Sequence, residues 1–173
     1  MPYPPQLVEP MRRELTALGV EELYTADSVD EAMEASEGDT VAVIINSVCG
    51  CAAGNARPAV RLAMNAQVQP DRYLTVFAGQ DLEATARMRS YLPGIPPSSP
   101  FIALFKSGQP AFILERRQIE GRTASAIAFD LAQAYARYCS NGSLSGSAEE
   151  QPVSGSGTSD SDSGMPDTFR SIL

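Results

Sequence analysis

Two of the three cysteines in this chain lie with a single glycine between them, in the stretch NSVCGCAAGNARP at residues 46–58. Ionised thiols attack disulfides and bind soft metals. The pair formed by Cys49 and Cys51 therefore has three interpretations: a redox centre, a metal clip, or two small buried residues. The chain contains no histidine. This excludes Ser-His-Asp and Cys-His nucleophile systems and removes the commonest neutral metal ligand.

The position of Cys49 favours a reactive thiol. It follows the run TVAVIIN at 40–46, which is typical of a central strand covered on both faces, and it precedes a helical segment. Open α/β folds place their sites at the carboxyl edge of the sheet, and a helix N-terminus favours thiolate over thiol. We expect Cys49 to be the attacking thiolate. Cys51 is closer to the first helical turn, so we expect it to be more covered and to act as the resolving cysteine.

The spacing of the two cysteines restricts how their sulfurs can meet. Residues i and i+2 of a helix point about 200° apart, so both cysteines cannot be helical and also bonded to each other. Gly50 tolerates unusual φ and ψ angles and is expected to supply the necessary bend. A CGC disulfide closes a ring of about 11 atoms, against about 14 for CxxC, which predicts a strained and easily reduced bond.

The metal interpretation and the inert interpretation are both weaker. A tetrahedral site within one chain would need a carboxylate or Cys139, which lies at the end of the last helical segment. We therefore expect no metal site. The inert interpretation treats the cysteines as small buried hydrophobes. For Cys139 that interpretation is favoured, and we expect a half-buried thiol.

Two prolines also need a structural reason. Pro58 falls inside the helical segment after the cysteines, where it removes the backbone hydrogen bond to Gly54 and is expected to kink the helix. Pro100 precedes a strand, and a cis bond at this position would present the backbone of Ser99 to a ligand.

Strands and helices alternate along the first 142 residues. In chain order we predict a helix before residue 19, a strand at 20–25, a helix at 28–36, a strand at 40–46, a helical segment to 66, a strand at 73–78, a helix at 81–92, a hairpin of strands at 101–106 and 111–116, and a helix at 123–138. Strands that alternate with helices and end in a hairpin imply an α/β fold. Its central sheet should be mixed, with helices on both faces.

Local signals define the helix positions. Four apolar residues recur at helical spacing and are expected in the core: Leu7, Met11, Leu15 and Leu18. This first helix should end at Gly19. Ser28 and Glu31 have the spacing of a capping box, and Asp81 is the predicted cap of a later helix.

The composition divides the chain into two parts. Residues 1–142 are predicted to form one domain. Residues 143–173 include 9 Ser, 4 Gly and five acids against one Arg, so we predict a disordered Ser/Gly-rich acidic tail. The net charge of -8 argues against nucleic acid or an anionic membrane as a partner.

The N-terminal sequence and the cysteine content indicate a compartment. Prolines and charges occupy the N-terminus, where a signal peptide needs an apolar region, and no later segment has the length of a membrane span. We therefore expect a cytoplasmic protein, in which cysteines are normally thiols. No oligomeric state follows from the sequence.

Several motifs together resemble the bacilliredoxin family, which has a thioredoxin fold and a CGC active site. They are PMRREL at 10–15, NSVCGCAAGNARP at 46–58, TVFAGQDLEATA at 75–86, PSSP at 97–100 and IEG at 119–121. The resemblance implies a thioredoxin-like sheet with an added N-terminal helix. It also implies that Pro100 is the cis-proline facing the cysteines and that Pro58 is the kinking proline of that fold. The family often has histidines near the IEG segment, where this chain has Arg117 and Arg122.

The activity implied by the resemblance is removal of bacillithiol from protein mixed disulfides. Cys49 would take the low-molecular-weight thiol and release the protein thiol, and Cys51 or an external thiol would regenerate it. Bacillithiol is then a co-substrate, bacillithiolated proteins are the partners, and no bound cofactor is needed. Arg57 is the arginine nearest in sequence and is predicted to hold a carboxylate of bacillithiol. The alternative for Arg57 is a solvated pair with Arg61 on a helix face.

Three other functions stay open from the sequence. Members of the same family have been discussed as disulfide isomerases, so that activity is the nearest alternative. A redox-sensing interaction module without turnover is the second. The third is a metal or iron-sulfur carrier that combines the CGC motifs of two chains.

Overall fold

The computed structural model describes residues 2–140, so the predicted tail lies outside the described residues. One five-stranded sheet has the strand order β1-β3-β2-β4-β5. Its strands are β1 (Glu21–Glu22), β2 (Thr40–Asn46), β3 (Arg72–Phe77), β4 (Phe101–Lys106) and β5 (Gln109–Leu114). β3 pairs in parallel with β1 and β2, whereas β4 is antiparallel to both β2 and β5. The predicted mixed sheet is confirmed.

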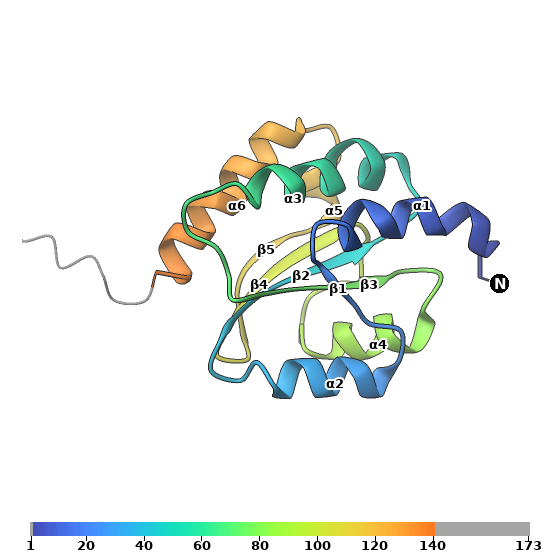
Figure 1. The fold of residues 1–173 in the computed structure, drawn as a ribbon, viewed down its shortest axis with the longest axis horizontal. Coiled ribbons are helices and arrows are strands. Elements are labelled where there is room, and N and C mark those ends of the chain that lie inside the picture. Colours follow the sequence, from blue (N-terminus) through green and yellow to red (C-terminus); the bar gives the residue numbers. More distant parts are fainter. Residues whose placement is uncertain (1, 141–173) are drawn as a thin grey trace, which may run out of the picture.

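Helices cover both faces of the sheet (Figure 1). One face carries α1 (Pro5–Thr16), α3 (Arg57–Ala63), the short α5 (Arg116–Ile119) and α6 (Ala124–Tyr138). The other carries α2 (Ala26–Glu34) and α4 (Leu82–Ser90). All seven residues of β2 are buried, because alternate side chains of the strand enter the two cores. The α/β fold is therefore thioredoxin-like, with α1 as the added N-terminal helix.

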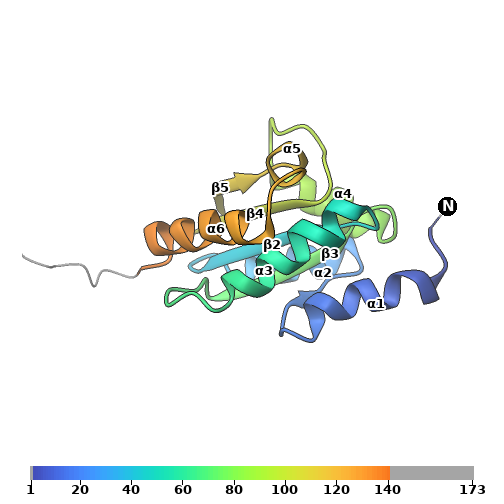
Figure 2. The same ribbon diagram turned by 90° about the horizontal axis from the view of Figure 1, so that it is seen from above.

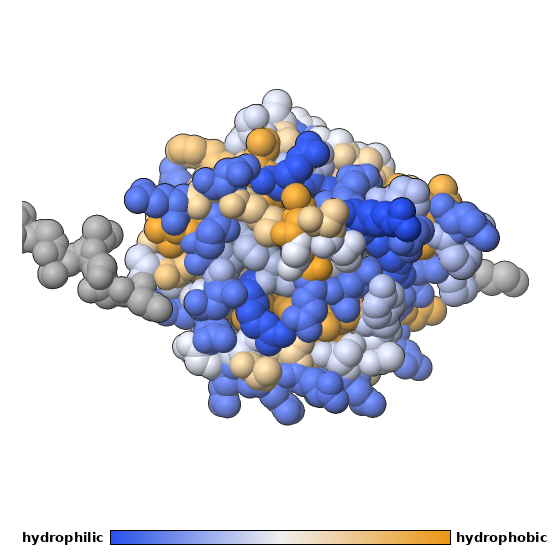
Figure 3. Space-filling view, viewed as in Figure 1, coloured by the Kyte–Doolittle hydropathy of each residue, from blue (hydrophilic) through white to orange (hydrophobic). Residues whose placement is uncertain are grey.

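The helices on the first face follow the order of the strands beneath them. Seen from above, α1 lies toward the β3 side of the sheet and α6 toward the β5 side, with α3 between them (Figure 2). On the face of the molecule seen in Figure 3, hydrophilic side chains predominate and apolar ones form small separate groups. The large apolar side chains are concentrated in the two layers between the helices and the sheet.

The predicted core stripe of α1 is confirmed at Leu15, which is fully buried, and at Leu18, which packs against the same core, but it is wrong in the first half of the helix. The buried residues are Val8, Arg12 and Leu15, whereas Leu7 is 48% exposed and Met11 is half-buried. Arg12 points inward and pairs with two carboxylates at the sheet edge. Its partners are Glu22 and Asp81.

Two predicted helix caps also differ from the structure. In α2 the cap is Thr25, whose hydroxyl accepts from the Ser28 N–H while Ser28 Oγ accepts from the Thr25 N–H. Ser28 is thus the second half of the capping box and not its start. Asp81 occupies the N-cap position of α4, but its side chain makes no cap hydrogen bond because it is directed to Arg12.

The terminal hairpin forms with a shorter turn than predicted. Lys106 pairs with Gln109 across Ser107 and Gly108, which both have positive φ, at 50° and 74°. Such a two-residue turn matches the twist of the flanking strands. β5 consequently ends at Leu114, and the next residues are free to form α5 beside the site.

Candidate active site

The two cysteines of the CGC motif lie with their sulfurs together at the carboxyl end of β2. Helical structure begins at Gly50, so Cys49 precedes the helix and Cys51 lies in its first turn. The Sγ atoms are 2.7 Å apart and both thiols are free. Cys49 is half-buried, whereas Cys51 is only 8% exposed. An incoming disulfide therefore meets Cys49 first.

Gly50 does not have the role expected from its conformational freedom. Its φ is not among the positive values found in the described residues. The sulfurs meet because Cys49 stands outside the helix, so no special glycine conformation is required. Gly50 is exposed, and a Cβ at this position would have no atom within 4 Å.

The surroundings of Cys49 favour its thiolate. Partial burial on its own would raise the pKa of the Cys49 thiol. Hydrogen bonds from Cys51 and from Ser47, whose Oγ is 3.2 Å from Cys49 Sγ, lower it. The backbone N–H of Ala52 and the positive charge of Arg116 act in the same direction. The net result is a pKa below the usual value of a cysteine.

Cys51 is affected in the opposite direction. Burial raises the pKa of Cys51, and the hydrogen bond to Cys49 and the charge of its thiolate raise it further. The exposed sulfur therefore ionises before the covered one. This order is what an attacking Cys49 and a resolving Cys51 require.

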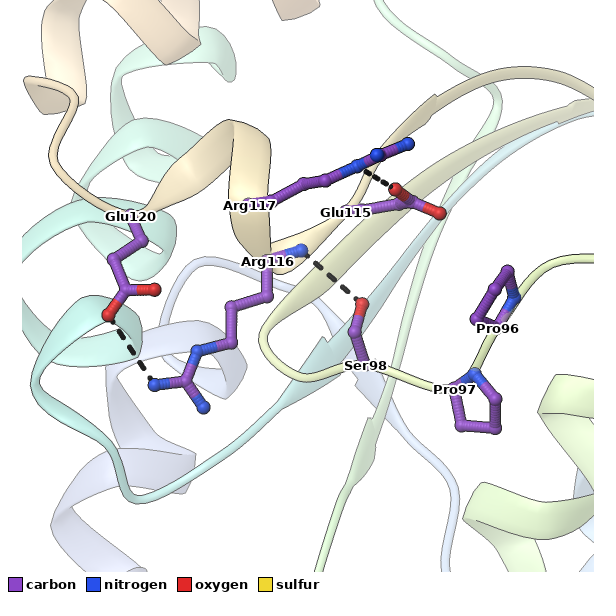
Figure 4. A pocket seen from close by; sticks show the side chains of 7 residues that line it. All are labelled: Pro96, Pro97, Ser98, Glu115, Arg116, Arg117 and Glu120. Carbon is purple, nitrogen blue, oxygen red and sulfur yellow. Dashed lines mark hydrogen bonds and ion pairs between the residues drawn. The ribbon is translucent and has the colours of Figure 1, made fainter.

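A groove of about 400 Å³ lies beside α5, between the 96–98 loop and the 115–120 segment. Figure 4 shows its charged side chains. The guanidinium of Arg116 is directed to Glu120 at 3.5 Å, and that of Arg117 to Glu115 at 2.5 Å. The Arg116 N–H donates to Ser98 Oγ at 3.3 Å and so links the two walls. Neither cysteine lines the groove, but the positive charge of Arg116 acts on the pKa values of both.

Arg116 gives a direct test of the electrostatics. Replacement of Arg116 by glutamine should raise the pKa of Cys49 and slow its alkylation at pH 7, because a nearby cation favours the thiolate. The measurement is the pH dependence of iodoacetamide labelling of the Cys49 peptide. Screening shortens to roughly 3 Å at 1 M salt, so the difference from wild type should shrink there.

The matched control for this test is the neighbouring arginine. Arg117 has an 82% exposed side chain and does not contribute to the pKa of either cysteine. Arg117→Gln should therefore leave the labelling profile unchanged. An equal shift in both variants would mean that net charge, and not the position of Arg116, affects Cys49.

Arg57 is not where either sequence interpretation placed it. It is 2% exposed, so it is neither a solvated partner of Arg61 nor free to hold a substrate carboxylate. Its guanidinium donates to Glu14, to Asn46 Oδ1 and to the Ser47 carbonyl. The arginines that line the groove are Arg116 and Arg117.

The loop before β4 brings two further predicted residues to the same sheet edge. The Ser99–Pro100 bond is cis, as the resemblance implied. Phe101 pairs with Ile45, so Pro100 lies level with Asn46, at the start of the segment that leads to Cys49. Ser99 is half-buried and adjoins Ser98 of the groove. Among residues 2–140, Ser99 makes no hydrogen bond to either sulfur. Its substrate-binding role stays a prediction.

The kink expected at Pro58 takes the form of a π-helical turn. This turn, η1 (Ala52–Ala56), lies between Cys51 and α3, and the Arg57 N–H bonds to the Ala52 carbonyl five residues back. Pro58 then stands in the first turn of α3, where its missing N–H costs little. The irregular turn is thus confined to the segment that directly follows the cysteines.

Cys139 belongs to a different part of the molecule. It follows α6 and is 9% exposed, so it is more deeply buried than expected, and burial raises its pKa. Thr40, which contacts it, starts β2, whereas Cys49 lies beyond the end of that strand. A strand of this length spans about 20 Å, so Cys139 cannot complete a metal site with the CGC pair. Within residues 2–140 no group of three or more potential ligands is assembled.

Sequence reasoning missed four residues around the thiols: Glu14, Asn46, Ser47 and Arg116. One signal was available, since Asn46 ends an otherwise apolar buried run and a buried polar side chain needs partners. For the others the relevant neighbours are distant in the chain. The charge of Arg116 acts on the thiols from α5, which forms after β5 ends at Leu114.

Comparison with known proteins agrees with this geometry. The family model described as "Disulphide isomerase" matches residues 3–139. A bacilliredoxin of Salinibacter ruber is 59% identical over 173 residues, which is 99% of each chain. A bacilliredoxin of Koribacter versatilis is 51% identical over 137 residues, covering 79% of this chain and 94% of that protein. The chain belongs to the bacilliredoxin family. Membership of this family and the paired thiols indicate a thiol-disulfide oxidoreductase.

Two further comparisons describe the extent of the likeness. The alignment with the S. ruber bacilliredoxin includes the Ser-rich tail, which the sequence motifs had left outside the resemblance. A thioredoxin of Fasciola hepatica is 16% identical, with a TM-score of 0.47 over 69% of this chain and 99% of the thioredoxin. None of the helices found in residues 2–140 of this bacilliredoxin-family chain has the length and apolarity to cross a membrane.

Proposed function

We propose that the chain removes bacillithiol, or a related low-molecular-weight thiol, from protein mixed disulfides. The observation that carries the proposal is the unequal thiol pair. Cys49 is accessible and its pKa is lowered, while Cys51 is covered, has a raised pKa and lies 2.7 Å away. A site of this kind separates the attacking sulfur from the resolving sulfur.

The reaction proceeds by two exchanges. The Cys49 thiolate attacks the sulfur of the small thiol in the mixed disulfide, forming a new disulfide to Cys49 and releasing the protein thiolate, which takes up a proton. Cys51 then loses its proton and attacks Cys49 Sγ. This forms the Cys49–Cys51 disulfide and releases the small thiol. A second thiol-bearing reductant returns the pair to the dithiol state.

The groove beside α5 supports a small charged thiol as the co-substrate. It presents two arginines and two glutamates, so it offers partners for a carboxylate and for an ammonium group. In this proposal Arg116, and not Arg57, binds a carboxylate of bacillithiol. A cytoplasmic location, where such thiols are reduced, is part of the same proposal.

The test uses a variant that stops after the first exchange. Cys51→Ala is incubated with a bacillithiolated protein, and its mass is recorded. The expected result is an adduct of one bacillithiol on Cys49 together with one released protein thiol, because no resolving sulfur is present. The absence of this adduct would refute the mechanism. A parallel sample carrying glutathione in place of bacillithiol shows which small thiol the groove accepts.

A disulfide isomerase activity is the second candidate, and the description of the matching family model favours it. It predicts that wild type and Cys51→Ala both reactivate a protein with scrambled disulfides. The proposed activity predicts removal of the small thiol without such reactivation. A redox-sensing module would show neither reaction at a catalytic rate.

A further inference from the structure

A chain of polar contacts connects the N-terminal helix to the reactive cysteine. Glu14 of α1 pairs with Arg57 of α3, with Arg57 Nε 2.8 Å from Glu14 Oε2. Arg57 Nη1 donates to Asn46 Oδ1 at 3.1 Å and to the Ser47 carbonyl at 3.0 Å. Ser47 Oγ in turn lies 3.2 Å from Cys49 Sγ. Three segments distant in sequence are thus joined at the end of β2.

Both backbone groups of Ser47, its N–H and its carbonyl, are hydrogen-bonded to neighbouring side chains. Its N–H donates to Asn46 Oδ1 at 2.9 Å, and its carbonyl accepts from Arg57. Asn46 is fixed as well, since its Nδ2 donates to the Met11 carbonyl of α1 at 3.4 Å. Both residues are nearly fully buried, at 1% exposed for Asn46 and 6% for Ser47. Bonds of this kind are costly to leave unmade, so they restrict the segment to one arrangement.

We propose that Arg57 is a positioning residue, which fixes the Asn46–Ser47 segment so that the Ser47 hydroxyl donates a hydrogen bond to the Cys49 thiolate. Glu14 holds Arg57 in place, which makes α1 part of the active site. The inference rests on the proposed function only in taking Cys49 as the attacking sulfur. It concerns how this sulfur is activated and does not depend on which small thiol is removed.

Arg57 could alternatively act directly on Cys49 through its positive charge. The geometry argues against this, since the guanidinium is paired with Glu14 and is bonded to the segment before Cys49, not to the sulfur. The charge that acts on Cys49 is that of Arg116. The two explanations differ in sign for Glu14→Ala. Loss of positioning slows the reaction of Cys49, whereas loss of a negative charge alone would speed it.

The experiment measures iodoacetamide labelling of Cys49 against pH, in the reduced full-length chain, by mass of the Cys49 peptide. Ser47→Ala should slow labelling at pH 7 by about tenfold and move the midpoint to higher pH, because a hydrogen bond to a charged group is lost. Arg57→Gln and Glu14→Ala should act in the same direction. In the Ser47→Ala background Arg57→Gln should add no further effect, since it acts through Ser47.

The controls come from a similar cluster elsewhere in the chain. Ser36 is 2% exposed, its Oγ accepts from Arg72, and Arg72 pairs with Glu21. Ser36→Ala and Arg72→Gln repeat the same chemical changes away from the thiols and should leave the labelling profile unchanged. Arg57→Lys separates geometry from charge, because lysine keeps the charge without the guanidinium fork. Full recovery in Arg57→Lys, or additive effects of Ser47→Ala and Arg57→Gln, would overturn the inference.

The labelling result can be interpreted independently of folding defects and of the proposed function. Circular dichroism establishes which variants are folded. If Arg57→Gln is not folded, Ser47→Ala and Glu14→Ala are sufficient to test the inference. A Glu14→Ala chain that labels as fast as wild type would contradict the role of α1. Labelling reports thiolate reactivity alone, so it stays informative even if the bacillithiol adduct on Cys51→Ala does not form.

Discussion

Replacement of Cys49 by serine is expected to abolish removal of the small thiol, with a loss on the order of a thousandfold or more. A serine hydroxyl is not ionised near neutral pH, whereas the Cys49 thiol has a lowered pKa and is the more exposed sulfur of the pair. Cys51 cannot substitute, because it is buried and its pKa is raised. The measurement is the rate at which free protein thiol appears from a bacillithiolated protein.

Cys139→Ala is the matched control for the loss of a thiol. Cys139 packs into the core at the opposite end of β2, so its removal should change the rate by less than about twofold. A Cys49→Ser chain that retained transfer and accumulated the adduct on Cys51 would reverse the roles assigned to the two sulfurs.

The order of the elements was predictable from the sequence because each element has a local signal. The apolar run of β2, the hairpin at Ser107–Gly108 and the alternation of strands and helices all depend on periodicity or on turn residues. The reactive position was predictable for the same reason, since Cys49 follows a buried strand. The position of Pro100 at this edge was predicted only by the family resemblance. No spacing of residues in the sequence predicted it.

No local sequence signal of this kind predicted the polar contacts around the site. Periodicity treats every arginine as a surface residue, yet Arg12 and Arg57 are 8% and 2% exposed. Each is buried because it finds carboxylates or carbonyls on distant segments, which no local pattern encodes. This is why the sequence pattern missed the burial of Arg12 in α1 and why Arg57 was assigned to the substrate.

Arg12→Ala is expected to lower the free energy of unfolding by about 3–5 kcal/mol, a large part of the stability of a domain this size. Arg12 joins α1 to the sheet edge through Glu22 and Asp81, and its guanidinium lies 5.0 Å from the Tyr24 ring centre and 5.1 Å from that of Phe77. Without it, two carboxylates with 8% and 12% exposed side chains lose their counter-ion. Urea unfolding at pH 7.5 measures the change.

The control is the next residue of the same helix. Arg13 has a 74% exposed side chain and pairs with Glu9 one turn earlier, so Arg13→Ala should cost less than about 0.5 kcal/mol. Equal losses in the two variants would show that helix propensity, and not the buried ion pairs, explains the effect.

The source of the Arg12 effect can be separated from simple loss of packing. Removal of one partner from a buried ion pair is costly chiefly because the remaining charge is left uncompensated. Adding Glu22→Gln and Asp81→Asn to an Arg12→Met chain should therefore recover part of the lost stability, although more native contacts have been removed. A further loss in the triple variant would show that the carboxylates stabilise the fold independently of Arg12, and that α1 is held at this edge by more than charge pairing.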